Sequence, residues 1–368
     1  SLLISSQSDS WLQQSEEELY LAVEGMLMTK ITDQTSKEII LASRPVGKVK
    51  KSDFKLREVP IPNPGPGEVL VRLLYLSIDP YMRGRMNAGR SYAPPFELGC
   101  VLGGGGVGEV IASKHKSISP GDIVTGDMGW RSYAIVRPGA LRKIDESLGP
   151  ISYGVSVLGM PGMTAYFGLL ELGKPKPGDT VFVSAAAGAV GSLVGQIAKI
   201  SGCYVVGTVG SNDKKEYCLS ELGFDRVINY RESENLNEQI LEACPRGIDI
   251  NFENVGGVVG DAAMRNLAFR ARVVVCGFVS EYNRATPYIG PSHLKDILVS
   301  RATVSGFLVT DWLQEWPQGI ARMANWLKNG KIVFKEDTSN GIESAPKVMM
   351  DMLDGQNFGK ALVKIAER

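Results

Sequence analysis

Histidine is nearly absent from this sequence, and its cysteines do not occur in metal-binding pairs. The 368 residues include two histidines, His115 and His293, and five cysteines, none of them in a C-x-x-C spacing. Catalytic zinc is held by several Cys, His or carboxylate side chains, so this inventory argues against a zinc enzyme. An odd number of dispersed cysteines also argues against a disulfide framework. We expect buried free thiols and a cytoplasmic protein.

The sequence also lacks an excess of charge of either sign and any long apolar run. Lys and Arg together number 40, as do Asp and Glu, so the formal net charge is zero. Binding to nucleic acid or to a membrane surface usually requires a clustered basic excess, and a bilayer-spanning helix requires about 20 apolar residues. We therefore expect neither a nucleic-acid partner nor a membrane. The length predicts about two domains.

The first 38 residues differ from the rest of the chain. They lack the basic start and the continuous apolar core of a secretory signal. Met28, followed by Thr29 and Lys30, would make a natural start. We therefore expect residues 1–38 to be an extension, translated upstream of that methionine or added during cloning, and to be disordered.

Residues 180–195 have the pattern of a dinucleotide-binding unit. The apolar residues 181–183 predict a short buried strand, small residues follow, and apolar residues then recur at helical spacing. The turn would lie at a helix N-terminus, where free N–H groups and the helix dipole favour a pyrophosphate. The motif G-x-G-x-x-G is present with Ala186 in its first position, followed by Gly188 and Gly191.

A second segment, Gly103 to Gly108, matches the same motif literally. It continues as E-V-I-A-S, an alternating strand pattern, so no helix N-terminus is available there to hold a phosphate. Glycine in a strand usually marks a bulge or a tight corner. We therefore predict a β-turn or a barrel bend at this segment.

The order of expected strands and helices divides the chain. Residues 39–136 contain short strands separated by Pro- and Gly-rich turns, which is typical of a compact β-barrel. In this region the Asp79-Pro80 step should end a strand and present Tyr81 and Arg83 on a loop. From Met160 onward, expected strands alternate with expected helices, and this alternation predicts a doubly wound parallel sheet. One of these strands is expected to begin at Arg272. The final G-K-A-L-V-K-I again has a barrel-strand pattern, so the chain should return to the first domain.

The end of the second strand of the dinucleotide-binding unit indicates the cofactor. An acid there accepts hydrogen bonds from the ribose 2′-OH of NAD, whereas basic residues favour the 2′-phosphate of NADP. Here the strand ends in Val209 and Gly210, and Asp213, Lys214 and Lys215 follow after two residues. We interpret Asp213 as a helix N-cap. The sequence therefore predicts NADPH as the cofactor.

Six motifs along the chain resemble one enzyme family. They are A-A-A-G-A-V-G-S-L-V-G-Q-I-A-K, L-G-M-P-G-M-T-A-Y, E-N-V-G-G, C-G-F-V-S-E-Y-N, S-I-D-P-Y-M-R-G-R-M and N-F-G-K. Together they are similar to the zinc-free medium-chain dehydrogenase/reductases, in particular the prostaglandin, 2-alkenal and curcumin reductase group. The resemblance implies a GroES-like β-barrel domain over 39–157, a Rossmann domain over 158–328 and a return to the barrel over 329–368. It also implies a homodimer that reduces the C=C bond of α,β-unsaturated aldehydes and ketones with NADPH.

The same resemblance implies a set of cofactor-binding residues. Gly188, Ala189, Val190 and Gly191 would contact the pyrophosphate, and Lys214 and Tyr230 the 2′-phosphate. The other cofactor-lining residues would be Pro80, Tyr81, Asn254, Cys276, Gly277, Phe278, Val279, Ser280, Tyr282, Phe307, Leu308, Val309 and Asn357. Each has a structural alternative, since Tyr230 could close a strand, Asn254 could form a turn and Phe307 could lie in the core.

The resemblance also places Tyr282 near the substrate carbonyl, where a proton donor is needed. Hydride addition to the β-carbon of an enone leaves an enolate that must be stabilised and protonated. A phenol keeps its proton at neutral pH, so we expect Tyr282 to donate, and the cofactor ribose 2′-OH could share this role. Tyr81 would line the substrate, and Tyr92 and Trp130 could supply aromatic walls. The alternatives are a quinone reductase and, in another class, a non-catalytic NADPH-binding sensor or structural protein.

Overall fold

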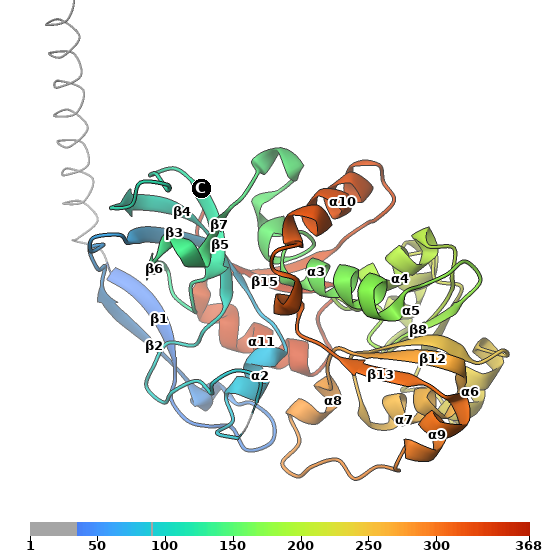
Figure 1. Cartoon of the computed structure of the whole chain (residues 1–368). Helices are drawn as coiled ribbons and strands as arrows, with labels where there is room; N and C mark the ends of the chain where they lie inside the picture. The colour runs from blue at the N-terminus through green and yellow to red at the C-terminus, as the bar shows by residue number, and fades with distance from the viewer. Residues whose placement is uncertain (1–34, 90) are drawn as a thin grey trace, which may run out of the picture.

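The computed structural model describes residues 35–89 and 91–368. Two main sheets organise this part of the chain, and they lie side by side (Figure 1). The middle of the chain forms one sheet, and segments from both ends of the described chain form the other. This arrangement agrees with the predicted two-domain organisation.

The middle of the chain forms a six-stranded parallel sheet in the order β10-β9-β8-β11-β12-β13. Its strands are β8 (Thr180–Val183), β9 (Tyr204–Val209), β10 (Arg226–Asn229), β11 (Ile248–Glu253), β12 (Leu267–Val275) and β13 (Thr303–Gly306). β8 is buried along its whole length, as a central strand covered on both faces must be. Val181 and Val183 join the apolar cluster on one face of the sheet, and Phe182 joins the cluster on the other. The predicted doubly wound sheet is therefore confirmed.

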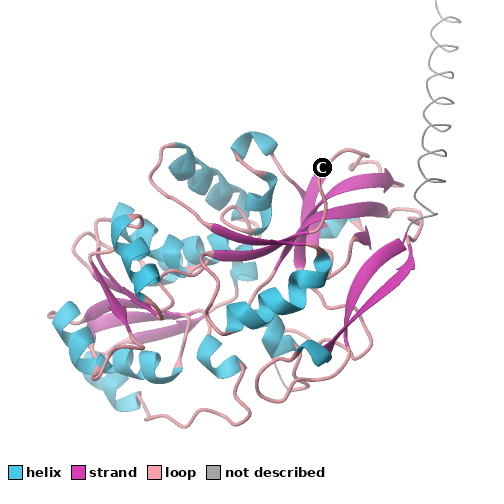
Figure 2. Cartoon of the chain, turned by 180° about the vertical axis from the view of Figure 1, so that it is seen from behind, coloured by secondary structure: helices cyan, strands magenta, loops and turns pink. Residues whose placement is uncertain are grey.

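Helices cover both faces of this sheet (Figure 2). The helices of this part of the chain are α3 (Met160–Phe167), which continues as a π-helix (Gly168–Gly173), α4 (Gly191–Ile200), α5 (Asn212–Ser220), α6 (Leu236–Ala243), α7 (Gly257–Arg265), α8 (Val279–Tyr282), α9 (Leu294–Ser300) and α10 (Trp316–Lys328). α4 buries Leu193, Val194 and Ile197 against the sheet, as its apolar spacing predicts. The predicted start of strand β12 is wrong, because this strand begins at Leu267 and not at Arg272.

The barrel domain contains a larger sheet in the order β14-β15-β3-β4-β5-β7, with β6 paired to β3, and a smaller sheet of β1 and β2. Its strands are β1 (Thr35–Leu41), β2 (Phe54–Pro60), β3 (Val69–Ser77), β4 (Gly105–Ser113), β5 (Ile123–Asp127), β6 (Tyr133–Val136), β7 (Leu141–Lys143), β14 (Glu336–Asn340) and β15 (Lys360–Lys364). Two helices belong to this region, α2 (Tyr81–Arg85) and α11 (Ala345–Leu353). Because β15 pairs antiparallel with β3, the chain does return to its first sheet.

The literal glycine motif is part of the barrel and not of a nucleotide site. Gly108 lies in β4, where an added Cβ would be 2.6 Å from the carbonyl oxygen of Arg72 on β3. The register between β3 and β4 shifts next to this point, between Leu73 and Tyr75. Glycine is therefore required by the close approach of two strands, and the predicted barrel bend is confirmed.

Two expectations for the barrel domain are wrong. β1 begins at Thr35, and Ser36 and Glu38 are buried, so the expected disordered extension does not include residues 35–38. The rest of that expectation lies outside the described residues. The segment after Pro80 is helix α2 and not a loop, and Arg83 is 1% exposed. Pro80 at the N-cap, with φ at −59°, already has a backbone suited to a helix start.

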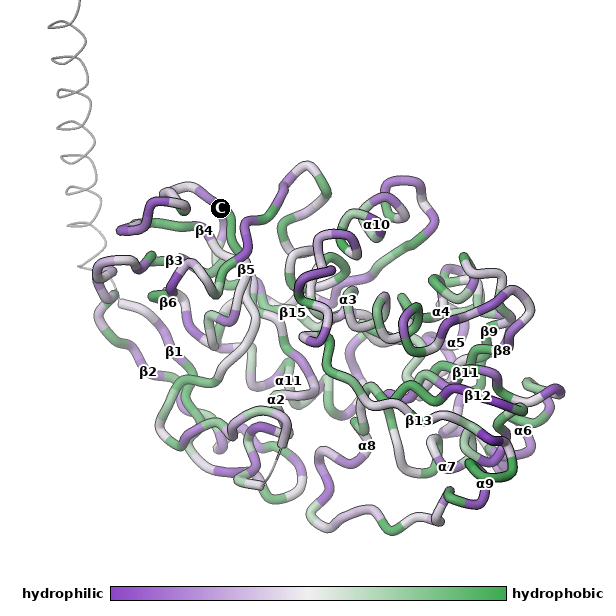
Figure 3. The backbone as a smooth tube through the Cα atoms, viewed as in Figure 1, coloured by the Kyte–Doolittle hydropathy of each residue, from purple (hydrophilic) through white to green (hydrophobic). Residues whose placement is uncertain are grey.

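The central strands β8 and β9 are largely hydrophobic, whereas the edge strand β13 is not (Figure 3). In residues 35–89 and 91–368, no helix has both the length and the apolar character needed to cross a membrane.

Candidate active site

The predicted cofactor-binding residues of the parallel-sheet domain lie along one edge of its sheet. The chain moves outward from β8 to β9 and β10 on one side and then crosses to β11 on the other, so the order reverses between β8 and β11. Doubly wound sheets bind ligands outside the carboxyl ends of their strands at such a switch point. The segments that follow these ends are Gly188–Gly191 after β8, Lys214 after β9, Tyr230 after β10, Asn254 after β11, Cys276–Tyr282 after β12 and Phe307–Val309 after β13.

The turn between β8 and α4 leaves backbone N–H groups available for an anion. Within the described residues the amides of Val190 and Gly191 donate to no backbone acceptor. Ala185 has φ at +52°, which turns the chain sharply before the helix. A Cβ on Gly191 would lie 2.3 Å from the carbonyl oxygen of Ala185, so only glycine fits at the first residue of α4. The turn therefore fits a pyrophosphate.

Ala186, which replaces the first glycine of the motif, is accommodated by a glycine on the neighbouring strand. A Cβ built on Gly207 of β9 would be 2.6 Å from the Cβ of Ala186, and Ala186 is fully buried. The departure from the motif is thus compensated inside the fold. Local sequence patterns do not identify Gly207 as the compensating residue.

Two cations and a phenol gather beyond the end of β9. The hydroxyl of Tyr230 and the Nε of Arg231 would lie 3.1 and 3.2 Å from a Cβ on Gly210. Burial, and then the nearby Arg231, lower the pKa of the Lys214 ammonium. These groups can hold a phosphate. Arg231 is missing from the predicted set, although its place directly after Tyr230 is a signal that could have indicated it.

The predicted cap of α5 is wrong. Ser211 is the N-cap and its Oγ accepts from the amide of Lys214 at 3.4 Å. Asp213 lies in the first turn of α5 and is exposed. A carboxylate in the first turn still interacts favourably with the helix dipole.

A buried hydrogen-bond network joins the ends of β8 and β11. Ser184 Oγ donates to Glu253 Oε1 at 2.8 Å and accepts from the amide of Asn254 at 2.8 Å. Asn254 Nδ2 donates to the carbonyl of Ser184 at 2.8 Å. The same Glu253 oxygen accepts from the amides of Val255 and Gly256 at 2.7 and 2.9 Å. Asn254 therefore forms part of a turn, as the structural alternative for this residue proposed. Ser184 and Glu253, which were not among the predicted residues, hold this turn in place.

Tyr282 closes the segment that follows β12. Its hydroxyl would lie 3.4 Å from a Cβ on Gly277, so the ring folds back over that glycine. Burial raises the pKa of Tyr282, which keeps the hydroxyl protonated at neutral pH. Burial also raises the pKa of the Cys276 thiol to about 12, so this thiol is not ionised. Phe278 and Ser280 are exposed.

The segment after β13 contains residues that pack on the core and one that is exposed. The ring of Phe307 packs edge-on against Phe252 and Trp312, with centroid distances of 6.4 and 5.7 Å. Phe307 therefore packs against the core, which was the structural alternative considered for it. Leu308, which follows, is 38% exposed, whereas Val309 is half-buried against the core cluster.

Two segments of the barrel domain approach the same edge. In the first, Asn357 Nδ2 donates to the carbonyl of Gly359 at 2.8 Å, and Gly359 forms a parallel bridge with Gly188 of the turn. In the second, the Nε of Arg83 in α2 donates to Oδ1 of Asn283 at 3.2 Å. α2 is thus tied to the residue that follows Tyr282.

The predicted aromatic residues of the barrel domain have different surroundings. Burial raises the pKa of Tyr81, at the start of α2, far above its ordinary value. Tyr92 is 61% exposed. Trp130 is not a wall of this site, because it is fully buried in the barrel core and stacks on Phe54 with centroids 5.7 Å apart.

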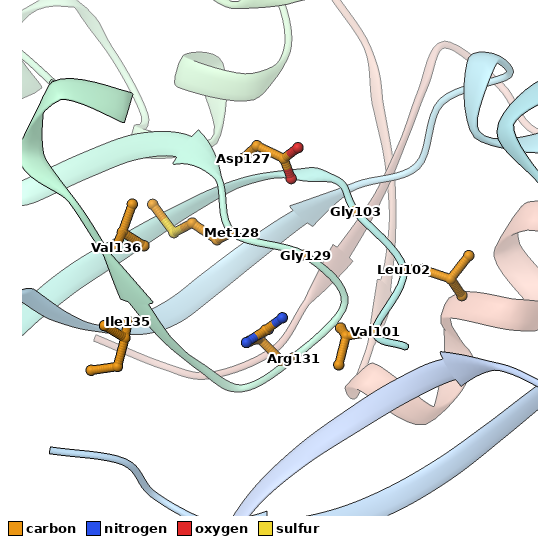
Figure 4. A pocket seen from close by; sticks show the side chains of 9 residues that line it. All are labelled: Val101, Leu102, Gly103, Asp127, Met128, Gly129, Arg131, Ile135 and Val136. Carbon is orange, nitrogen blue, oxygen red and sulfur yellow. The ribbon is translucent and has the colours of Figure 1, made fainter. Parts of the chain in front are cut away.

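A cavity of about 240 Å³ lies elsewhere in the barrel domain (Figure 4). It is lined by Val101, Leu102, Gly103, Asp127, Met128, Gly129, Arg131, Ile135 and Val136. None of these belongs to the predicted site, so the cavity does not define the cofactor site.

No group of three or more His, Cys, Asp or Glu side chains in the described part of the chain is placed to hold a metal ion. His293 lies between Asp261 and Asp296, with nitrogen to oxygen distances of 2.7 and 2.9 Å. His115 is exposed. All five cysteines are free, but Cys100 is exposed and Cys276 is half-buried, so the expectation of buried thiols is wrong for these two.

A β-barrel domain beside a doubly wound sheet, with a phosphate-binding turn at the switch point, defines a two-domain, dinucleotide-dependent oxidoreductase. Residues 37–144 match the family described as N-terminal domain of oxidoreductase, and residues 189–325 match the family described as zinc-binding dehydrogenase. The chain belongs to the medium-chain dehydrogenase/reductase family.

Named relatives share nearly their whole length with the chain. It is 42% identical over 338 residues to the NADPH-dependent curcumin reductase of Escherichia coli, which covers 90% of this chain and 98% of the relative. It is 42% identical over 337 residues to the NADP(+)-dependent 2-alkenal reductase of Nicotiana tabacum, with the same coverage. The crystal structure of CurA in complex with NADPH from Vibrio vulnificus matches with a TM-score of 0.86 and 42% identity, covering 90% of this chain and 100% of that one. The predicted family and fold are confirmed.

Proposed function

We propose that the protein reduces the C=C bond of α,β-unsaturated aldehydes and ketones with NADPH. The observation that carries this proposal is the meeting of a phosphate-binding turn, a pair of cations and a protonated tyrosine along one sheet edge. The relatives named curcumin reductase and 2-alkenal reductase support the same reaction class.

The residues fit NADPH at both phosphate positions. The backbone of Gly188–Gly191 holds the pyrophosphate at the N-terminus of α4. Lys214 and Arg231, with the hydroxyl of Tyr230, hold the 2′-phosphate, since two cations beside a phenol match its charge and its acceptors. The other predicted residues surround the nicotinamide half, with Pro80, Tyr81 and Asn357 contributed by the barrel domain.

Tyr282 is the residue that we assign to the developing negative charge. When bound, the cofactor supplies a hydride to the β-carbon of the substrate. Tyr282 donates a hydrogen bond to the carbonyl oxygen, which becomes more negative in the transition state. Burial holds the proton on Tyr282 and keeps the thiol of Cys276 neutral, so a competing anion is absent at these two positions. Tyr81 lines the substrate from the opposite domain.

The test is identification of the product by NMR after incubation with NADPH and a panel of enals, enones, a diarylheptanoid, quinones and an isolated alkene. A saturated ketone is expected from an enone, and the isolated alkene should remain unchanged because it offers no carbonyl to receive the electron pair. An allylic alcohol would overturn the reaction class. Oxidation of NADPH by quinones alone would indicate a quinone reductase, and no oxidation by any compound would indicate a binding protein.

We further propose that two copies associate through β13. This strand ends the sheet, and its outer edge pairs with no strand in the described residues, so its backbone groups can pair with the same strand of a second copy. Exposed apolar side chains flank the edge, and α9 is largely hydrophobic in Figure 3. They are Phe269, Leu294, Leu298, Val299 and Val304. Light scattering should give the mass of two chains and, for the variant Leu298→Lys/Val304→Lys, the mass of one; a monomeric wild type would contradict the proposal.

The remaining assignments are the domain bounds and the compartment. We propose a barrel domain that starts at Thr35 and extends to about residue 157, a dinucleotide-binding domain over 158–328 and a return over 329–368. The change of sheet membership between β7 and β8 and again between β13 and β14 supports these bounds. We also propose a cytoplasmic location, which the five free thiols support.

A further inference from the structure

A single segment, Asp354–Lys360 between α11 and β15, contacts distant parts of the candidate cofactor site. At its start, two carbonyl oxygens accept hydrogen bonds from the cations assigned to the 2′-phosphate. Lys214 Nζ donates to the carbonyl of Gly355 at 2.7 Å, and Arg231 Nη2 donates to that of Asp354 at 3.3 Å. The adenosine end of the site therefore lies directly against this segment.

The same segment continues past the pyrophosphate turn. Gly359 bridges to Gly188, and a Cβ on Gly359 would lie 2.2 Å from the carbonyl oxygen of Lys335. The φ of Gly359 is +78°, so this position requires glycine for its conformation and for its space. The path of the segment against the turn is thus fixed by backbone packing.

At its end, Lys360 makes a buried ion pair with Asp79. The two residues are 1% and 4% exposed, and Nζ lies 3.1 Å from Asp79 Oδ1. Nζ also donates to the carbonyls of Ile78 and Ala361 at 2.7 and 2.9 Å, so all three of its N–H bonds have acceptors. The hydroxyl of Ser77 donates to the other Asp79 oxygen at 2.5 Å.

Asp79 connects this ion pair to Tyr81. The carbonyl of Asp79 accepts from the amide of Met82 at 3.2 Å, which closes the first turn of α2 around Tyr81. A buried ion pair contributes little net stability, because the loss of hydration offsets the attraction between the charges. A pair of apolar side chains could give the same net stability, but it would not fix the start of α2 relative to β15 through directed hydrogen bonds. We therefore assign the ion pair a geometric role.

We propose that the segment Asp354–Lys360 couples binding of the cofactor's 2′-phosphate to the position of Tyr81, with Lys360 and Asp79 as positioning residues. This inference rests on the proposed function, since it requires NADPH as the cofactor. An ammonium has three N–H donors and a guanidinium five, so Lys214 and Arg231 can hold the phosphate and the carbonyls together. Phosphate binding then restrains both cations and the segment attached to them. The 2′-phosphate should consequently raise kcat as well as affinity.

The first test measures the segment without any reduction taking place. Hydrogen exchange of the full-length protein is followed with saturating 2′,5′-ADP and, in parallel, with saturating 5′-AMP, which differs from it only by lacking the 2′-phosphate. We expect the amides of residues 355–360 to exchange more slowly with 2′,5′-ADP than with 5′-AMP. Equal exchange with the two nucleotides would overturn the coupling. Because no enone is present, failure of the proposed reductase activity leaves this result interpretable.

The second test measures the far end of the coupling. Lys360→Met should bind 2′,5′-ADP as the wild type does, while kcat with saturating NADPH falls about tenfold to a hundredfold, the loss typical of slightly misplaced reactants. The ratio of kcat with NADPH to kcat with NADH should fall toward one. Lys364→Met, on the same strand and at a partly exposed ion pair with Glu367, is the matched control and should keep the wild-type ratio.

A third variant separates positioning from simple stability. Asp79→Leu/Lys360→Met replaces the ion pair by apolar side chains, and its melting temperature should be close to that of the wild type. We expect this variant to keep a low kcat and a NADPH to NADH ratio near one. Recovery of both the wild-type kcat and the wild-type ratio would show a purely structural role for the pair and would overturn the assignment. The comparison holds even if Lys360→Met does not fold.

Discussion

Lys214 in α5 donates a hydrogen bond from its ammonium to the carbonyl oxygen of Gly355, 141 positions further along the chain, at 2.7 Å. This contact joins the parallel-sheet domain to the barrel domain at the proposed 2′-phosphate site. Arg231 contacts the neighbouring carbonyl of Asp354. The side chains that we propose to bind the phosphate therefore also form contacts between the two domains.

The first prediction is that Lys214→Ala weakens binding of NADPH selectively. The ammonium has a phosphate to meet in NADPH but none in NADH, and a charge-assisted contact is worth roughly 1.5 to 3 kcal/mol, or about tenfold or more in affinity. Dissociation constants measured by calorimetry check the prediction, with Lys215→Ala in the same helix as the control. Equal losses for NADPH and NADH would remove Lys214 from the 2′-phosphate site.

The second prediction concerns Tyr282→Phe. Removing the hydroxyl removes a hydrogen bond that strengthens in the transition state, so kcat should fall more than KM rises. A loss of roughly tenfold to a thousandfold fits one oxyanion donor, and the low end applies if the ribose hydroxyl or water substitutes. Steady-state kinetics with one enone give the answer. An undiminished kcat would keep the reaction class but exclude Tyr282 from the mechanism.

The third prediction is that activity survives prolonged treatment with a chelator and that elemental analysis finds no stoichiometric zinc. The reason is the shortage of suitable ligands, with two histidines in the sequence and no suitable cluster of side chains in residues 35–89 and 91–368. Activity that is lost on chelation and restored by zinc would refute it.

The fourth prediction is a loss of stability that depends on His293 and sets in as pH rises above about 6.5. Burial opposes protonation of this side chain, but hydrogen bonds to Asp261 and Asp296 outweigh it and raise its pKa above 6.5. A raised pKa in the folded state gives stability that is fully present below about pH 6.5 and is lost as pH rises through the folded value. Melting temperatures of the wild type and of His293→Gln should therefore differ most in mild acid and converge at higher pH. A difference that does not change with pH would contradict the charge-based explanation.

The two glycine motifs show how far local pattern can reach. Both contain glycines at the required spacing, but only Gly188 and Gly191 are followed by apolar residues at helical spacing, and only there does the structure have a helix N-terminus. Gly108 is followed by an alternating pattern and lies in β4. Apolar periodicity predicted the helix in one case and the strand in the other, because it reflects which face of a helix or strand is buried.

Burial of single side chains was less predictable. Trp130 and Arg83 follow or interrupt strands in positions typical of loops, and both are buried. Their burial depends on partners that are distant in sequence, such as Phe54 for Trp130 and Asn283 for Arg83. A local pattern contains no information about these partners.

The dinucleotide-binding turn, the alternation of strands and helices, the return of the last strand and the family could all be predicted from the sequence, because backbone conformation and apolar periodicity are local properties. Three pairings became visible only in the folded chain: Gly207 accommodates Ala186, Arg231 joins Lys214, and Lys360 reaches Asp79. These pairings arise when different segments are packed together, and in the case of Asp79 and Lys360 the segments lie hundreds of residues apart. Their energies come from burial and from distances of a few ångströms, which no spacing along the chain encodes.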